Sequence, residues 1–139
     1  MRKLCITLVV FYGLTAGNVD AATWVKVVAS STSRIFVDTG SIIKTGDIVT
    51  AWYRRDFNRP MASKKIHRPY KSSKVLNYYN CSSREIAAAQ WITYENNNGT
   101  GKIVSNEKVI SLAYGDIPPG EAGEPVFDFL CKYVKQHKM

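Results

Sequence analysis

The fold is decided near the C-terminal end, where residues 124–135 read EPVFDFLCKYVK. At 100° per residue, the apolar side chains of this stretch fall on one broad arc and the charged ones fall opposite. Glu124 and Pro125 suit a first helical turn, because an anion is favourable at the positive end of a helix and the missing N–H of proline goes unneeded there. The stretch predicts an amphipathic helix whose apolar arc is formed by Val126, Phe127, Phe129, Leu130, Tyr133 and Val134.

The surface that this helix must cover is predicted to be a β-sheet. β-Branched and aromatic residues cluster in short runs that are bounded by Gly, Asn, Asp and Ser. In one run, Ile35 and Val37 alternate with Arg34, Phe36 and Asp38, which is the period-two pattern of a half-buried strand. Strands are expected over residues 23–29, 34–38, 48–54, 74–81, 85–95, 102–105 and 109–114.

Three further segments set the limits of the sheet. Residues 96–101 read NNNGTG and predict a hairpin turn, because Asn and Gly tolerate positive φ. Residues 118–120, two prolines and a glycine, end the sheet. Residues 58–73 are too polar to bury and predict either an exposed loop or an extended hairpin. Together these segments predict one α+β domain, an antiparallel sheet of about six strands with a C-terminal helix on its face.

The N-terminal residues have the three parts of a cleavable secretory signal peptide. Arg2 and Lys3 precede an apolar stretch, and small residues then lead to Ala21. The alternative, a transmembrane anchor, needs about 20 uninterrupted apolar residues, and this stretch is interrupted well before that length. We expect residues 1–21 to be removed and residues 22–139 to form one exported domain.

The three cysteines have different expected roles. Cys5 stands at the start of the apolar stretch and leaves with the signal peptide, so no lipid anchor is expected. Cys81 and Cys131 remain, and an even pair in an exported protein normally forms a disulfide. Cys131 lies at the edge of the apolar arc, where its sulfur can reach a sheet beneath the helix. The alternative is a pair of free, buried thiols.

The positive charge is concentrated in one segment. Residues 54–74 hold eight cations and one anion, and the rest of the expected exported chain is neutral overall. Arginine is a fork-shaped donor for sulfate, phosphate or carboxylate, and Tyr53, Phe57 and Tyr70 add contact area. The segment predicts either a solvated loop or a patch that binds a polyanion. The candidate ligand-binding residues are Arg54, Arg55, Arg59, Lys64, Lys65, Arg68, Lys71 and Lys74.

The partners of such a patch are limited by the expected export of the chain. Glycosaminoglycans, lipopolysaccharide phosphates and acidic segments of host proteins are the candidate polyanions. Nucleic acid would suit the charge but is not expected as a partner at that location.

The sequence shows no set of residues typical of catalysis. A nucleophile needs a base within hydrogen-bond reach, and the only histidines are His67 in the basic segment and His137 near the end. A metal site is not expected, because these histidines are far apart and both remaining cysteines are expected to be bridged. We therefore predict neither an enzyme nor a cofactor or metal site.

Several short motifs, taken in order, resemble the surface-adhesin protein E family of bacteria. They are Trp24-Val25-Lys26-Val27, Phe36-Val37-Asp38 with Ser41-Ile42, Ala51-Trp52, Asn80-Cys81 with Arg84, Ile117-Pro118-Pro119-Gly120 and Phe129-Leu130-Cys131. The resemblance spans nearly all of the chain that follows the signal peptide. It implies an antiparallel sheet with a C-terminal helix tethered to it by a disulfide between Cys81 and Cys131.

The resemblance also implies a function. The best-known members of the family are outer-membrane adhesins that bind host matrix and serum proteins such as vitronectin and laminin, and can dimerise. It therefore implies a non-catalytic binding module at the cell surface, with host proteins or polyanions as partners and a homodimer as one assembly. The adhesin is a lipoprotein and this chain has no lipidation cysteine, so the alternative is a soluble periplasmic structural or accessory protein without a host ligand.

Processing at the expected cleavage site can be measured directly. We expect the exported protein to begin at Ala22, or within a residue or two of it, and to carry no lipid. Intact-mass spectrometry of protein recovered from the producing cell checks both points. An uncleaved N-terminus or the added mass of an acyl chain would contradict the expectation.

Overall fold

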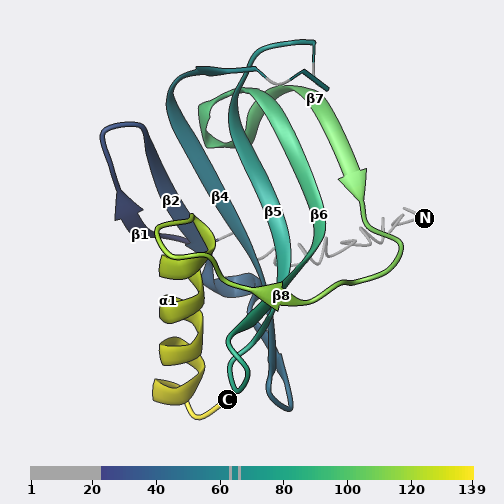
Figure 1. Cartoon of the computed structure of the whole chain (residues 1–139). Coiled ribbons are helices and arrows are strands. Elements are labelled where there is room, and N and C mark those ends of the chain that lie inside the picture. The colour runs from purple at the N-terminus through teal and green to yellow at the C-terminus, as the bar shows by residue number, and fades with distance from the viewer. Residues whose placement is uncertain (1–22, 63, 66) are drawn as a thin grey trace, which may run out of the picture.

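The computed structural model describes residues 23–62, 64–65 and 67–139, so the predicted signal peptide over residues 1–21 lies outside the described residues (Figure 1). The strands are β1 (Trp24–Ala29), β2 (Ser33–Asp38), β3 (Ile43–Thr45), β4 (Ile48–Met61), β5 (Tyr70–Asn80), β6 (Glu85–Asn96), β7 (Thr100–Lys108) and β8 (Gly115–Asp116). The helices are the α-helix α1 (Gly123–Gln136) and two short 3₁₀ turns, η1 (Thr39–Ser41) and η2 (Asn97–Gly99).

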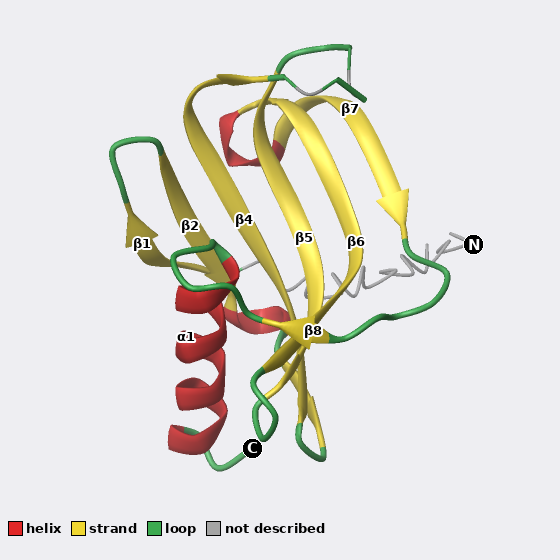
Figure 2. Ribbon diagram, viewed as in Figure 1, coloured by secondary structure: helices red, strands yellow, loops and turns green. Residues whose placement is uncertain are grey.

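The strands form one antiparallel sheet in the order β1-β2-β4-β5-β6-β7 (Figure 2). The two remaining strands are short additions, β3 beside β4 and β8 beside β6. Apart from the short β3, which lies between β2 and β4 in the chain, the neighbours in the main sheet follow one another along the chain. The predicted α+β class, with about six main strands and one C-terminal helix, is confirmed.

Helix α1 covers one part of one face of the sheet, where it contacts β1 and β4 (Figures 1 and 2). Four of the six predicted arc positions are buried: Val126, Phe127, Leu130 and Val134. They pack against sheet residues that point to the same side, namely Ile35, Val37, Val49, Ala51 and Tyr79. Burying each such side chain contributes about 1.5 to 3 kcal/mol, so this contact forms the hydrophobic core.

The polar segment over residues 58–73 is an extended hairpin, the second of the two predicted alternatives. Strand β4 continues to Met61, well beyond the predicted end at residue 54, and β5 begins at Tyr70. Met61 pairs with Tyr70 across the two strands. The basic residues of this segment are therefore carried by a paired structure.

The strand that was predicted over residues 109–114 does not form. Only the backbone N–H of Val109 continues the pairing, by donating to the carbonyl of Ala89 at 2.8 Å. Ile110 is fully exposed beyond it. The chain leaves the edge of β6 after Val109 and returns to it at β8, where Gly115 lies opposite Ile86. Residues 110–114 are too many to pair with the short stretch of β6 between these two points, so they loop away from the sheet and gain no ladder of hydrogen bonds.

Cys81 and Cys131 form the predicted disulfide, with their Cα atoms 5.8 Å apart. Cys81 directly follows β5, and Cys131 lies in the middle of α1. The alternative of two free thiols is therefore wrong. The bond ties the helix to the end of a central strand. The hydrophobic contact and the covalent bond therefore both hold the helix against the sheet.

Removing the disulfide should cost a large part of the stability. The bond closes a segment with a sequence separation of 50, for which the chain-entropy model gives about 4 kcal/mol. We expect the C81S/C131S double variant to lose about 2 to 5 kcal/mol of unfolding free energy while keeping its helix. Denaturant unfolding followed by circular dichroism measures both. An unfolding midpoint equal to that of the parent protein would contradict the expectation.

Candidate binding site on the hairpin of β4 and β5

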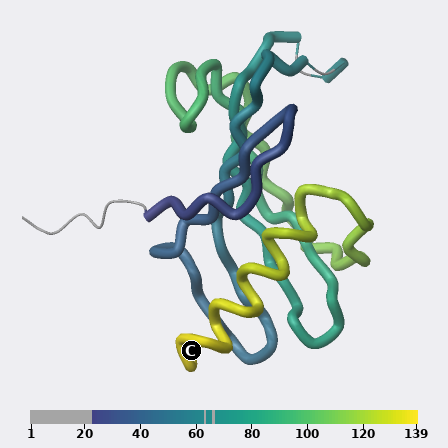
Figure 3. Tube along the Cα trace, turned by 90° about the vertical axis from the view of Figure 1, so that its left-hand side faces the viewer, coloured from purple at the N-terminus to yellow at the C-terminus, as the bar shows by residue number. Residues whose placement is uncertain are grey.

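The hairpin of β4 and β5 extends past the strands on either side of it (Figure 1). Pairing between β2 and β4 ends where Ser33 lies opposite Phe57, and β4 continues for four more residues. The tip of this hairpin and the turn between β6 and β7 diverge to opposite sides of the sheet (Figure 3). The part of the hairpin beyond Phe57 is therefore open to solvent.

Arg54 is not part of that open surface, so its prediction as an exposed donor is wrong. Its residue exposure is only 7%, and its Nε donates to Asp56 Oδ2 at 3.1 Å. Its guanidinium carbon lies 4.9 Å from the ring centroid of Trp24 and 4.5 Å from that of Phe36. The cause is strand geometry, because alternate residues of β4 face opposite sides and Arg54 faces the side away from α1.

Lys74 belongs to the same cluster on the side away from α1. It pairs with Arg54 across β4 and β5, and its ammonium lies 5.7 Å from the ring centroid of Trp24 and 5.2 Å from that of Tyr94. Burial raises the pKa of the Tyr94 hydroxyl above its ordinary value. Cation–π contact partly satisfies this charge.

The turn between β6 and β7 folds back across the sheet and completes the cluster. The carboxylate of Asp56 is fully buried, and its Oδ1 accepts a bond from the backbone N–H of Asn98 at 2.8 Å. Asn97 Nδ2 donates to the carbonyls of Phe57 and Lys71 at 3.1 and 3.0 Å. Asn98 has a φ of 63°, which asparagine tolerates. The sequence predicted the turn, but not its docking onto β4 and β5.

The remaining six predicted cations are exposed or half-exposed, and we call them the hairpin cations: Arg55, Arg59, Lys64, Lys65, Arg68 and Lys71. Lys65 forms an ion pair with Glu107 at 2.7 Å. The other ion pairs among residues 23–62, 64–65 and 67–139 are Arg54 with Asp56 and Arg84 with Asp128. Within the described chain, five of the six hairpin cations therefore have no carboxylate partner.

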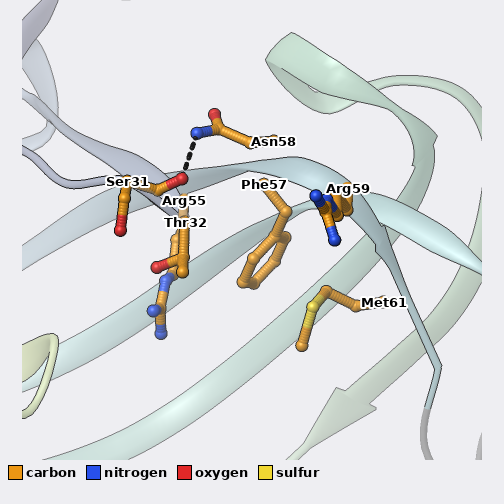
Figure 4. Close-up of a pocket in the computed structure, with 7 residues that line it drawn as sticks. All are labelled: Ser31, Thr32, Arg55, Phe57, Asn58, Arg59 and Met61. Carbon is orange, nitrogen blue, oxygen red and sulfur yellow. Dashed lines mark hydrogen bonds between the residues drawn. The ribbon is translucent and has the colours of Figure 1, made fainter.

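Two cavities flank the extended hairpin. The larger one, of about 540 Å³, is lined by Ser31, Thr32, Arg55, Phe57, Asn58, Arg59 and Met61 (Figure 4). We call it the Arg55–Arg59 pocket. The smaller one, of about 290 Å³, is lined by Pro60, Arg68, Pro69, Tyr70, Lys71, Glu95 and Asn96. Four of the hairpin cations therefore line a concave surface, which the charge pattern of the sequence alone does not show.

The two histidines stand apart from each other. His67 is exposed in the hairpin tip, and the His137 ring stacks on Tyr133 with the ring centroids 3.9 Å apart. Within the described part of the chain, no group of three or more His, Cys, Asp or Glu side chains is placed to hold a metal ion. No helix among these residues is long and apolar enough to span a bilayer.

The model of the family described as surface-adhesin protein E matches residues 24–132. No curated protein matches the sequence significantly.

Solved structures of Haemophilus influenzae protein E share the fold. One has a TM-score of 0.57 at 13% identity, with 81% of this chain and 86% of that chain covered. Another, from a non-typeable strain, has a TM-score of 0.59 at 13% identity, with 94% and 86% covered. A second crystal form has a TM-score of 0.57 at 12% identity, with 94% and 99% covered. At these identities the likeness shows the fold alone.

Removing the buried carboxylate of Asp56 should lower the unfolding free energy of the protein. We expect Asp56→Ala to cost about 3 to 5 kcal/mol, because it leaves the buried Arg54 guanidinium without its counter-charge. As a control, Asp128→Ala removes a carboxylate whose side chain is 59% exposed in its pair with Arg84, and should cost less than about 1 kcal/mol. Denaturant unfolding of both variants tests this, and equal stabilities would contradict it.

Proposed function

The chain belongs to the surface-adhesin protein E family, and from this premise we propose that it is a non-catalytic binding module of the bacterial cell envelope. Its partner is a polyanion or a host protein with an acidic surface, held by the hairpin cations. The family description supports the class of function. The exposure of the hairpin cations supports the choice of the hairpin as the surface that contacts the partner.

The main support for the proposal is that the hairpin of β4 and β5 holds two groups of cations in different environments. Arg54 and Lys74 are held against aromatic rings on the side away from α1. All of the hairpin cations except Arg55, which lies opposite Ile35 of β2, instead lie on the part of the hairpin that extends past the neighbouring strands. Of the six, only Lys65 has a carboxylate partner within the described chain. Exposed charges without a carboxylate partner attract an anionic partner and guide its approach.

The chemistry of the hairpin cations fits sulfate, phosphate and carboxylate groups. Each arginine presents a planar fork of donors that bonds such groups in pairs, whereas the lysines act as compact point charges. Glycosaminoglycans, lipopolysaccharide phosphates and acidic segments of host matrix or serum proteins all carry these groups. The proposal places the protein outside the cytoplasm, at the periplasm or the cell surface.

Heparin-affinity chromatography tests the proposal with matched variants. The R59Q/K64Q/R68Q variant removes three exposed charges from the hairpin. The control, K44Q/K132Q/K135Q, removes three exposed charges from β3 and α1. We expect the parent protein and the control to elute at similar salt concentrations and the hairpin variant to elute at a much lower one. Exposed charges are screened over about 8 to 10 Å at physiological ionic strength, so charges away from the hairpin contribute little to binding there.

Stability measurements separate loss of binding from loss of folding. Both variants should melt close to the parent protein, because exposed charges contribute about 0 to 1 kcal/mol each. If both elute at the salt concentration of the parent protein, the hairpin is only a solvated arm. The polyanion-binding surface must then lie elsewhere on the sheet.

A further inference from the structure

We propose that the Arg55–Arg59 pocket binds a peptide segment of a protein partner in which a carboxylate adjoins a large apolar side chain. The inference rests on the proposed function and names the chemistry of the partner at one place. The pocket has a defined shape and fixed polar groups, so we expect it to select its ligand by shape and hydrogen bonding as well as by charge.

The Arg55 side chain is held in place before any ligand arrives. Its Nε donates to the Oγ of Ser33 at 2.9 Å, and Ser33 is itself 4% exposed. The guanidinium carbon lies 5.0 Å from the ring centroid of Phe57. These two contacts fix the plane of the guanidinium while its two terminal nitrogens have no carboxylate partner among the described residues. A fixed fork loses little conformational entropy when it bonds a carboxylate.

Arg59 completes the polar part of the pocket. In Figure 4 the two arginines stand on either side of the Phe57 ring. Arg55 also lines a neighbouring cavity with Glu121 and Glu124, yet neither glutamate forms an ion pair with it within the described chain. The pocket therefore presents two guanidinium groups whose charge an incoming carboxylate can pair with.

Phe57 and Met61 form the apolar part of the pocket wall. Phe57 is 9% exposed and is held edge-on against Tyr70, with ring centroids 5.8 Å apart and planes at 81°. Met61 is 39% exposed, and its unbranched thioether can adjust to the shape of an apolar group. Pockets of about 300 to 1,000 Å³ with an apolar lining and a few placed polar groups are typical of specific ligand sites, and this pocket falls in that range.

The side wall of the pocket is anchored by Asn58. Its Nδ2 donates to the carbonyl of Ser31 at 2.7 Å, which Figure 4 shows as a dashed line. Its backbone N–H donates to the carbonyl of Thr32 at 2.9 Å. These bonds join β4 to the turn between β1 and β2, so the two sides of the pocket are held at a constant separation.

The chemistry of the pocket residues favours a peptide side chain over an added β-strand or a sulfated sugar as the occupant. Addition of a β-strand along this edge is disfavoured, because Pro60 has no N–H to donate. A sulfated sugar would bury less apolar surface against Phe57 and Met61 than a hydrocarbon side chain does. A peptide that carries a hydrocarbon side chain beside a carboxylate satisfies both the apolar wall and the two forks.

The test uses NMR titration of the purified protein with three hexapeptides capped at both ends. The first contains Phe-Glu between Gly-Ser pairs, the second Phe-Gln and the third Ala-Glu. We expect the Phe-Glu peptide to shift the Met61 methyl and Phe57 amide signals in a saturable way. The other two should bind about tenfold more weakly, because one loses a charged hydrogen bond and the other loses apolar burial.

Two variants separate this inference from the proposed function. R55K/R59K keeps both charges but loses the forks, so it should bind the Phe-Glu peptide about tenfold more weakly, while its heparin elution should shift far less than that of R59Q/K64Q/R68Q, because no charge is removed. K64Q/K65Q should lose heparin retention and keep peptide binding. Arg59→Lys alone is on an exposed side chain and serves if the double variant folds poorly.

Each other outcome overturns the inference. If R55K/R59K binds the Phe-Glu peptide as tightly as the parent protein does, the forks are not a carboxylate site. If a heparin oligosaccharide shifts the pocket signals and no peptide does, the occupant is a polysaccharide. If no probe shifts these signals, the pocket is not a binding site, whatever the heparin result for the rest of the hairpin.

Discussion

The fully buried carboxylate of Asp56 is the constraint on which one side of the sheet depends. A carboxylate removed from water costs several kcal/mol unless it is paired and hydrogen-bonded. Here Arg54 and the backbone of Asn98 supply the bonds, and Trp24 and Phe36 pack against the guanidinium. One charge therefore ties β1, β2 and β4 to the turn between β6 and β7, which is far from them in the sequence.

This arrangement explains how the side of the sheet away from α1 is closed without a second layer. A sheet normally buries one face against helices or another sheet, and α1 serves that purpose near β1, β2 and β4. On the opposite side, aromatic rings alternate with Arg54 and Lys74, so that each ring covers a cation and each cation covers a ring. Polar pairing and stacking there do what hydrophobic burial does under the helix.

The base of the extended hairpin is held in place by hydrogen bonds from two asparagines. Asn97 binds the carbonyls of Phe57 and Lys71 at its base, and Asn58 joins β4 to the turn between β1 and β2. Binding residues are most effective when a rigid scaffold holds them in place. The hairpin therefore carries its exposed charges from a fixed base, although the part that reaches furthest pairs with no strand outside the hairpin.

Sequence reasoning succeeded where the signal is local and failed where it depends on distant partners. The periodicity over residues 124–135 and the pairing of Cys81 with Cys131 needed no knowledge of the fold. The apolar run over residues 109–114 has strand propensity, but propensity does not report that the chain holds more residues here than the edge of β6 can pair before β8. For Arg54 a signal did exist, since its spacing of two from Asp56 places both side chains on one face of a strand.

By itself, the sequence determined the helix, most of the strands, the disulfide and the segment that carries the excess charge. These follow from periodicity, propensity, cysteine number and composition, which act over a few residues or over the whole chain. Only the tertiary structure decided which cations are free, because the sheet register brings Trp24, Phe36 and Asn98 to Arg54 and leaves Arg55 and Arg59 at the wall of a pocket. Burial depends on what the rest of the chain places nearby, and no local pattern contains that information.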